Sequence, residues 1–206
     1  IILEPVQGEG GFNPVPKKYL QGLRDYCDKH NIMLIIDEVQ SGFARAGNWA
    51  CWQEYGVQPD ISTYAKSLGS GLPIAAVVGK AKVMDAAAPG SIGGTYIGSP
   101  VCCAAALATI KLMKEQNLNE RAKYIGNIIK ERMAEVQKDC PAIGDIRGVG
   151  AMIGIEFIKN SDYRQADSEL CSKVVKGCAE EGLIMLSAGM HKNVVRILSP
   201  RNAWPF

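Results

Sequence analysis

The stretch Met33-Leu34-Ile35-Ile36-Asp37-Glu38 decides the fold of this chain, because four consecutive apolar residues lead directly into a pair of acids. A short run that is apolar at every position is typical of a strand buried on both faces of a parallel sheet. In such sheets the functional groups gather at the carboxyl ends of the strands. Asp37 follows one apolar run and Lys66 follows the next, at residues 61–64, so both lie where a site is expected.

Helical patterns alternate with short apolar runs through the first hundred residues. Apolar spacing predicts a helix over 16–31 and strands at 1–3, 33–36, 61–64 and 75–78. Ser99 can cap a further helix that starts at Pro100 and extends to about residue 116. The alternation predicts an α/β fold with a mostly parallel sheet.

The last third of the chain has the pattern of an α+β module. After a helix at about 119–138, residues 146–158 predict a strand pair or one long bent strand. The remaining expected elements are an amphipathic helix over 166–181, which Gly182 ends, and strands at 183–186 and 194–198. We therefore predict two domains, formed by residues 1–117 and 118–206.

The composition is that of a globular protein, since 206 residues with 47% hydrophobic content can bury a substantial core. The net charge is +2 with acids and bases interspersed, which gives no reason to expect nucleic acid or a membrane as a partner. No apolar stretch has the length of a membrane span, and the first residues do not resemble a signal peptide. The seven cysteines form no CxxC pair, so we expect no metal site and reduced thiols in a cytoplasmic protein.

A carboxylate at the end of one strand and a lysine after the next suit the chemistry of pyridoxal phosphate. The amine of Lys66 would form a Schiff base with the cofactor aldehyde, and Asp37 would pair with the protonated pyridine nitrogen. The pairing keeps the ring cationic, so that it accepts the electron pair released when a substrate Cα–H bond breaks. Most lysines are merely solvated, however, and these two residues alone leave other interpretations open.

Residues 33–38 also fit the Walker B pattern, in which an acid pair holds Mg²⁺ in nucleotide hydrolases. That function requires a GxxxxGK[ST] loop. The Gly79-Lys80 pair has Ile74 in place of the first glycine and Ala81 in place of the final serine or threonine. A nucleotide hydrolase is therefore a remote alternative, and a structural role for Asp37 in a turn is another.

Three further features have both a structural and a functional interpretation. The glycine-rich segment 148–154 departs from GxGxxG and lies in an apolar run, which favours close strand packing over dinucleotide binding. The segment Glu4-Pro5-Val6-Gln7-Gly8-Glu9-Gly10-Gly11 is either a polar turn or a loop that brings Glu9 into a cleft. Arg196 lies on a mainly apolar strand, where a buried cation needs either a salt-bridge partner or a bound anion.

Five motifs, in this order along the chain, together resemble the class III (ω-amino acid) aminotransferases, and most closely their 4-aminobutyrate branch. They are Leu3-Glu4-Pro5-Val6-Gln7-Gly8-Glu9-Gly10-Gly11, Leu34-Ile35-Ile36-Asp37-Glu38-Val39-Gln40-Ser41-Gly42, Pro59-Asp60 leading to Ala65-Lys66-Ser67-Leu68, Gly93-Gly94-Thr95-Tyr96, and Val195-Arg196-Ile197-Leu198. The resemblance extends over essentially the whole chain up to Pro200.

The resemblance implies a fold-type I pyridoxal-phosphate-dependent transferase. Residues 1–117 would form the C-terminal part of its large domain with an interdomain helix, and residues 118–206 its small α+β domain, truncated. The start Ile1-Ile2-Leu3-Glu4 has no initiator methionine, so we expect a fragment that lacks the N-terminal half and the extreme C-terminus. The missing half would supply much of the cofactor site, and the isolated chain is expected to bind the cofactor poorly and to be inactive.

The resemblance also implies a role for each cofactor-binding residue. Lys66 would form the Schiff base and move the substrate proton, while Asp37 would pair with the pyridine nitrogen. Val39 would pack on a ring face, and Gln40 would donate a hydrogen bond to the phenolic oxygen of the ring. Thr95 would bind the cofactor phosphate of the neighbouring subunit, which implies a homodimer with shared active sites. One departure follows Asp37, since members of the family commonly have Gly-Arg-Thr-Gly at residues 44–47, where this chain has Ala-Arg-Ala-Gly.

On the substrate side, Arg196 would bind a carboxylate and Glu9 would be its switchable partner. The implied reaction moves an amino group from an ω-amino acid, foremost 4-aminobutyrate, to 2-oxoglutarate, a 2-oxo acid. Pairing with Glu9 would neutralise Arg196 for the ω-amino donor, and release would free the guanidinium to bind the acceptor in a bidentate manner. An ornithine, acetylornithine or other ω-amine donor is the main alternative, and a non-catalytic fragment is a further one.

Overall fold

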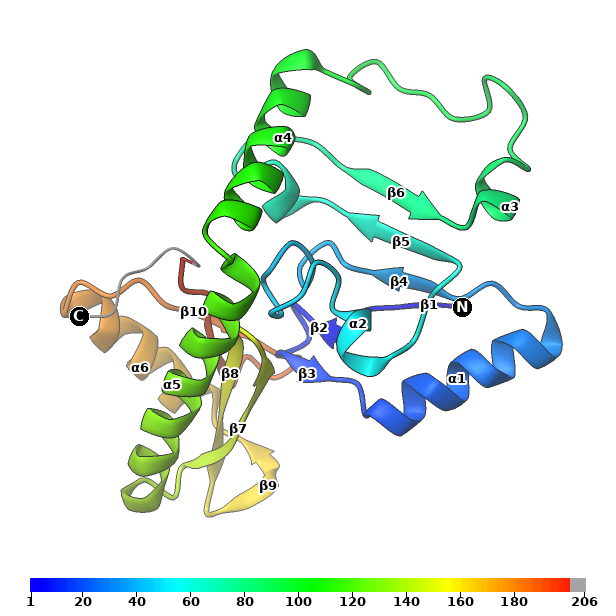
Figure 1. Cartoon of the computed structure of the whole chain (residues 1–206). Helices are drawn as coiled ribbons and strands as arrows, with labels where there is room; N and C mark the ends of the chain where they lie inside the picture. The colour runs from blue at the N-terminus through cyan, green and yellow to red at the C-terminus, as the bar shows by residue number, and fades with distance from the viewer. Residues whose placement is uncertain (201–206) are drawn as a thin grey trace. The chain divides into compact units, whose positions relative to one another are not determined.

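The computed structural model describes residues 1–200, which divide into two compact units (Figure 1). The first unit contains Ile1–Pro5 and Val15–Asn119, and the second contains Val6–Pro14 and, of the described residues, 120–200. The division predicted from the sequence placed Val6–Pro14 with the first domain, whereas the structure groups this segment with the second unit. The end of the predicted small domain, residues 201–206, lies outside the described residues.

A four-stranded sheet forms the centre of the first unit. Its strands are β1 (Ile2–Leu3), β4 (Ile35–Asp37), β5 (Ile61–Tyr64) and β6 (Ala76–Gly79), in the order β1-β4-β5-β6. The pairs β1–β4 and β4–β5 are parallel, and β6 runs antiparallel to β5. The mostly parallel sheet predicted from the apolar runs is therefore confirmed, with one antiparallel strand at its edge.

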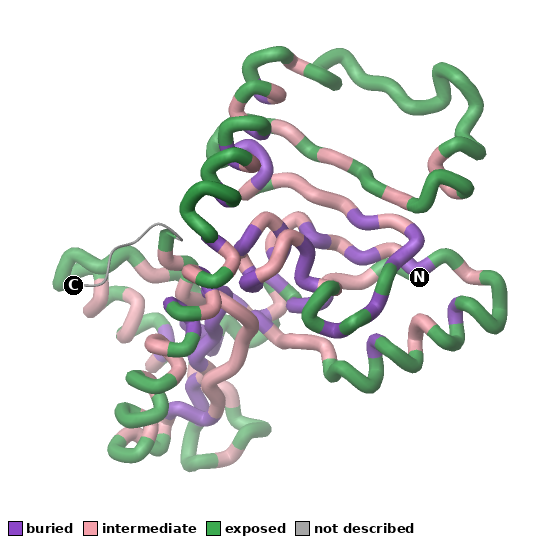
Figure 2. The backbone as a smooth tube through the Cα atoms, in the orientation of Figure 1, coloured by how far each residue is buried: buried purple, intermediate pink, exposed green. Residues whose placement is uncertain are grey.

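The central strands are more buried than the edge strand (Figure 2). Leu34 and Ile36 are fully buried, as the apolar pattern predicts. Val77 and Val78 of β6 are 57% and 56% exposed, although the same pattern predicts a strand buried on both faces. The prediction is wrong for β6, which lies at the edge of the sheet and, within residues 1–200, pairs with β5 alone.

The long helices of the first unit follow local sequence signals. Helix α1 (Lys17–His30) begins after Pro16 and ends at Asn31, which has the left-handed backbone that commonly terminates helices. Helix α4 (Pro100–Glu115) begins with proline at its first position, as predicted. The one-turn elements were not predicted, because a single turn has no apolar periodicity to detect. They are α2 (Trp52–Tyr55), η1 (Lys66–Leu68) and α3 (Ala81–Met84).

An antiparallel sheet forms the centre of the second unit. Strands β7 (Ile143–Val149), β8 (Met152–Lys159), β10 (Leu186–Ala188) and β11 (Val194–Ile197) lie in the order β10-β11-β8-β7, and β9 (Asp162–Ala166) also pairs with β8. The predicted strand pair at 146–158 is confirmed as β7 and β8. The strand predicted at 183–186 begins only at residue 186, and β9 was not predicted.

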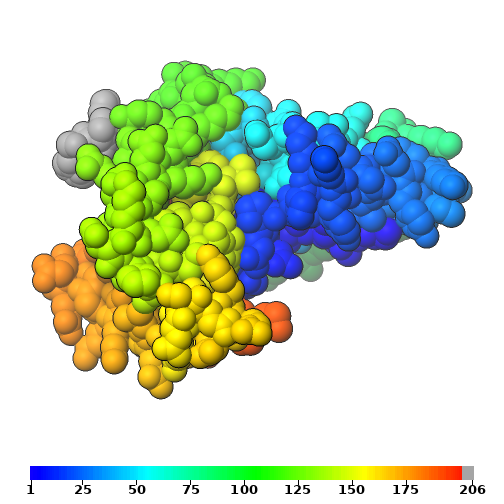
Figure 3. Space-filling view, turned by 90° about the horizontal axis from the view of Figure 1, so that it is seen from below, coloured from blue at the N-terminus to red at the C-terminus, as the bar shows by residue number. Residues whose placement is uncertain are grey.

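Two helices and a small hairpin complete the second unit. Helix α5 (Leu118–Asp139) leads into it, and α6 (Ser168–Glu180) packs on the sheet around the buried residues Phe157, Cys171 and Val195. The outer surfaces of α5, α6 and the β9 region are seen in the space-filling view (Figure 3). Strands β2 (Val6–Gln7) and β3 (Asn13–Pro14) form the hairpin, and β3 lies against β7.

No helix within residues 1–200 is both long and apolar enough to cross a membrane. Within the same residues, histidine, cysteine and acidic side chains do not gather into a group that could hold a metal ion.

Candidate active site

Asp37 lies at the carboxyl end of β4, in the first unit, and its carboxylate has a fixed orientation. The backbone N–H of Val39 donates a hydrogen bond of 2.9 Å to Asp37 Oδ1. This bond closes a tight turn directly after the strand and holds the half-buried carboxylate at the sheet edge. In the register of the sheet, Asp37 is opposite Thr63 of β5.

Lys66 follows β5 at the same edge of the sheet. It comes three residues after Thr63, and β4 and β5 are adjacent and parallel, so the sheet brings the ends carrying Asp37 and Lys66 together. The φ angle of Lys66 is 40°, in the left-handed region that non-glycine residues rarely adopt. Such a conformation costs on the order of 1–3 kcal/mol and is concentrated at functional sites.

The side chain of Lys66 is exposed and lines an open hollow of about 750 Å³. The other residues that line this hollow are Ala65, Gly71, Leu72, Pro73, Ile74 and Ala75. Its volume lies within the range of about 300–1,000 Å³ that is usual for small-molecule and cofactor sites. Lys66 is therefore an accessible residue beside a space large enough for a cofactor.

Thr95 lies in the loop before α4 and lines a second hollow of about 360 Å³. This hollow shares Pro73, Ile74 and Ala75 with the one beside Lys66. Thr95 itself is exposed. The structure thus places Lys66 and Thr95 along adjoining hollows, whereas Asp37, Val39 and Gln40 line neither of them.

Glu38 supports the turn that follows β4. This residue was assigned no role of its own from the sequence. Its side chain is buried, and it accepts hydrogen bonds from Ser41 Oγ at 2.5 Å and from the backbone N–H of Trp52 at 2.9 Å. Burial raises its pKa above the ordinary value, against the opposing effect of these hydrogen bonds. Glu38 therefore ties the turn that contains Val39 and Gln40 to the start of α2. The feature of the sequence that could have indicated this role is the position of Glu38, close behind a buried strand.

The second unit contains the other predicted pair, Glu9 and Arg196, in direct contact. Arg196 Nη1 donates to Glu9 Oε1 at 2.6 Å. The arginine side chain on β11 is only 14% exposed, while the glutamate side chain, between β2 and β3, is 72% exposed. The buried Nε of Arg196 has no hydrogen-bond partner. A largely buried cation that is paired with an exposed acid can bind another carboxylate if that acid rotates away.

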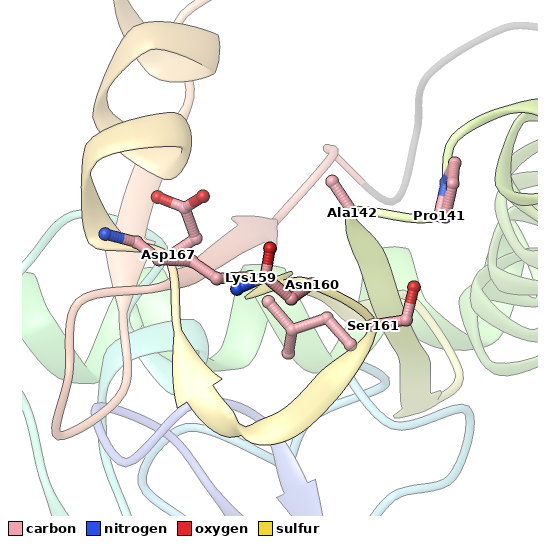
Figure 4. Close-up of a pocket in the computed structure, with 7 residues that line it drawn as sticks. Pro141, Ala142, Lys159, Asn160, Ser161 and Asp167 are labelled. Atoms are coloured by element: carbon pink, nitrogen blue, oxygen red, sulfur yellow. The ribbon is translucent and has the colours of Figure 1, made fainter.

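A third hollow, of about 370 Å³, lies elsewhere in the second unit (Figure 4). Asp167 lies on one side of it, with Pro141 and Ala142 on the other. Asp167 Oδ1 accepts a hydrogen bond of 3.0 Å from the backbone N–H of Leu170, so this acid caps α6. None of the predicted site residues lines this hollow.

Comparison with known proteins decides the family, because the model for class-III aminotransferases matches residues 1–201. The chain belongs to the class-III aminotransferases. It is 49% identical to the 5-aminovalerate aminotransferase DavT of Pseudomonas aeruginosa and 46% identical to the 4-aminobutyrate aminotransferase GabT of Escherichia coli. Both alignments cover 97% of this chain and 47% of the relative, so the chain spans about half the length of the curated relatives it matches.

Solved structures of transaminases give the same result for the fold. A transaminase from the marine bacterium Virgibacillus superposes with a TM-score of 0.93 at 29% identity, over 99% of this chain and 48% of that chain. The ornithine aminotransferase from Toxoplasma gondii superposes with a TM-score of 0.87 at 33% identity, over 97% and 46%. The predicted fold-type I transferase fold, present in part, is therefore confirmed, and so is the family resemblance.

Proposed function

We propose that the protein containing this chain transfers an amino group from a short ω-amino acid, of the 4-aminobutyrate or 5-aminovalerate type, to 2-oxoglutarate. The observation that carries the proposal is the contact between Glu9 and Arg196. An ion pair that opens would let the arginine accept two kinds of substrate. The names of the relatives, which act on 4-aminobutyrate and 5-aminovalerate, support the donor class.

The proposed cofactor is pyridoxal phosphate, and two observations support it: Lys66 lines the larger hollow, and Asp37 ends the strand next to β5. When bound, the cofactor supplies an electron sink for the pair released from a substrate C–H bond. Asp37, whose Oδ1 accepts a hydrogen bond from the N–H of Val39, would pair with the pyridine nitrogen. The amine of Lys66 would hold the cofactor through its aldehyde group and would move the substrate proton. Gln40 belongs to the turn that Glu38 holds in place, and its proposed partner is the phenolic oxygen of the ring.

The partner subunit is part of the proposal. Thr95, exposed beside its own hollow, would bind the cofactor phosphate of the neighbouring subunit in a homodimer. We place the reaction in the cytoplasm, which is supported by the seven cysteines, all of them free thiols in the structure.

Arg196 and Glu9 would distinguish the two substrates by charge. An ω-amino donor presents its amine on a carbon without a carboxylate, so the neutral Glu9–Arg196 pair suits it. The 2-oxo acid has a carboxylate beside its reacting carbon, and this group takes the place of Glu9 on the guanidinium. The exposed position of the Glu9 side chain gives it space to rotate away.

Ornithine or acetylornithine is the alternative donor. Solved ornithine aminotransferases superpose on the chain with TM-scores of up to 0.88, and an acetylornithine aminotransferase superposes equally well. Initial rates with 4-aminobutyrate, 5-aminovalerate, ornithine and acetylornithine at matched concentrations would identify the donor.

The test of the chemistry is covalent labelling at Lys66. The protein at its full encoded length is loaded with pyridoxal phosphate, treated with sodium borohydride to make the lysine–cofactor linkage permanent, and mapped by peptide mass. We expect the label on the peptide that contains Lys66. Lys66→Met should lose the label and lower the transamination rate by about 10³-fold or more, whereas Lys82→Met, on the exposed side of α3, should keep both. A label on another lysine would overturn the assignment.

A further inference from the structure

Arg147, on β7, makes contacts that no predicted function uses. Its Nε and Nη2 donate hydrogen bonds of 3.0 Å and 2.8 Å to the backbone carbonyl of Gly11. Its Nη1 donates to Asp145 at 2.9 Å and to Glu156. The side chain is only 14% exposed. A largely buried guanidinium is thus aimed at one carbonyl of the turn that contains Glu9.

The register of the sheet explains this arrangement. Gly154 of β8 is paired with Arg147 on one side and with Arg196 on the other, so the three residues form a row on one face. A Cβ atom on Gly154 would lie 3.2 Å from the carbonyl oxygen of Gly11 and 3.2 Å from Phe12 Cβ. The glycine therefore leaves room for the backbone of the turn to cross the sheet between the two arginines.

The turn at residues 8–12, here called the Glu9 turn, has a tightly held backbone. The carbonyl of Glu9 accepts a hydrogen bond of 3.0 Å from the N–H of Gly189, and that of Gly10 accepts one of 2.9 Å from Asn13 Nδ2. The carbonyl of Gly11 is held by Arg147, and Phe12 is fully buried. The Glu9 side chain is in contrast 72% exposed. A fixed backbone thus presents an exposed carboxylate.

The orientation of Arg147 is in turn set by acids around it. Glu156 accepts a hydrogen bond of 3.0 Å from Asn193 Nδ2 through its other oxygen, Oε1, so its carboxylate cannot turn freely. Asp145 and Glu156 therefore hold Nη1 of Arg147, while Nε and Nη2 donate to the Glu9 turn. This network fits a role in positioning the turn.

We propose that Arg147 is a positioning residue for substrate discrimination. It fixes the Glu9 turn so that Glu9 moves on and off Arg196 by side-chain rotation alone, and so that the ion pair re-forms each time the ω-amino donor binds. This inference rests on the proposed function of Glu9 and Arg196. Without Arg147, the turn loosens, the pair forms less often, and the donor meets an uncompensated guanidinium.

The test compares Arg147→Met and Arg147→Lys with Arg164→Met, a control on β9 whose side chain is 90% exposed. In the holoenzyme at full encoded length, single-turnover rates are measured with 4-aminobutyrate and with glutamate. We expect Arg147→Met to lower the 4-aminobutyrate rate about tenfold relative to the glutamate rate. Arg147→Lys, which cannot donate two bonds to one carbonyl in the same geometry, should show part of this shift, and the control none.

A double variant separates positioning from general damage. If Arg147 acts through Glu9, then Glu9→Ala combined with Arg147→Met should shift the rate ratio no further than Glu9→Ala does alone. Equal losses in both half-reactions, or independent effects in the double variant, would overturn the proposal. If Arg147→Met does not fold, the same rate ratios are measured for Arg147→Lys, alone and combined with Glu9→Ala.

Hydrogen exchange gives a readout that is independent of activity. Amides of the Glu9 turn should lose protection in both Arg147 variants and keep it in the control. Unchanged protection would refute the anchoring role even if the rates change. If the wild-type protein performed neither half-reaction, the proposed function would fail, while loss of protection in the Arg147 variants would still establish the anchor.

Discussion

We expect Asp60→Asn to destabilise the first unit by about 2–3 kcal/mol, because one buried carboxylate joins three of its elements. Asp60 Oδ2 accepts hydrogen bonds from Arg24 Nη1 of α1 and from the backbone N–H of Leu34, both at 2.8 Å. Asp60 Oδ1 accepts one of 2.7 Å from Lys80 Nζ, and the side chain of Asp60 is 8% exposed. Asparagine retains one acceptor oxygen and turns an N–H group toward a donor.

The magnitude follows from the pKa of Asp60. Burial alone would raise this pKa, but hydrogen bonds from Lys80, from the N–H of Leu34 and from Arg24 outweigh burial and lower it from 3.8 to about 2. A difference of nearly two units favours the ionised form in the folded state by about 2.4 kcal/mol. The stabilisation is fully present above pH 3.8 and is lost as the pH falls from 3.8 toward 2.

Urea unfolding and hydrogen exchange of the Leu34 amide measure the effect. The control is Asp28→Asn, because Asp28 also pairs with Arg24, at 2.7 Å, but is 62% exposed. An exposed ion pair of this kind is worth about 1 kcal/mol or less. The difference between wild type and Asp60→Asn should be constant near neutral pH and should shrink below pH 3.8. A loss no larger than that of the control, or a difference that does not depend on acid pH, would refute the reasoning.

Two further predictions concern a matched pair of helix glycines and a buried acid. Gly126→Ala in α5 should cost about 3 kcal/mol or more, because its Cβ would lie 1.8 Å from the carbonyl oxygen of Gly150. In Gly177→Ala, in α6, the added Cβ meets nothing within 4 Å, so this variant should instead be stabilised by up to about 1 kcal/mol. Melting temperatures that change in the same direction in both variants would contradict this. Burial raises the pKa of Glu38, so the folded wild type binds this proton more tightly than the unfolded chain does. The wild type therefore loses stability as the pH rises above 4.5, and Glu38→Gln should become more stable relative to it. Urea unfolding across this range checks it, and a difference independent of pH would count against the burial argument.

The sequence by itself was sufficient for the elements and residues that depend on local pattern. The apolar runs before Asp37 and Lys66 predict buried parallel strands, because a strand that is apolar at every position can be covered on both faces without burying polar side chains. Helices α1 and α4 could be predicted for a similar reason, since the apolar spacing of α1 and the proline at the first position of α4 are both local signals. The family, too, was evident from the five motifs, and the match to residues 1–201 confirms it.

The family resemblance predicted that Glu9 pairs with Arg196, 187 residues away, although no local pattern could show it. Only the tertiary structure showed that Arg147 contacts the same turn, because Gly11 and Arg147 are 136 residues apart and no motif linked them. The antiparallel direction and exposure of β6, and the grouping of Val6–Pro14 with the second unit, likewise depend on which strands pair. Pairing is a property of the folded chain as a whole, because the free energy of each contact is gained only after the intervening residues have been brought into place.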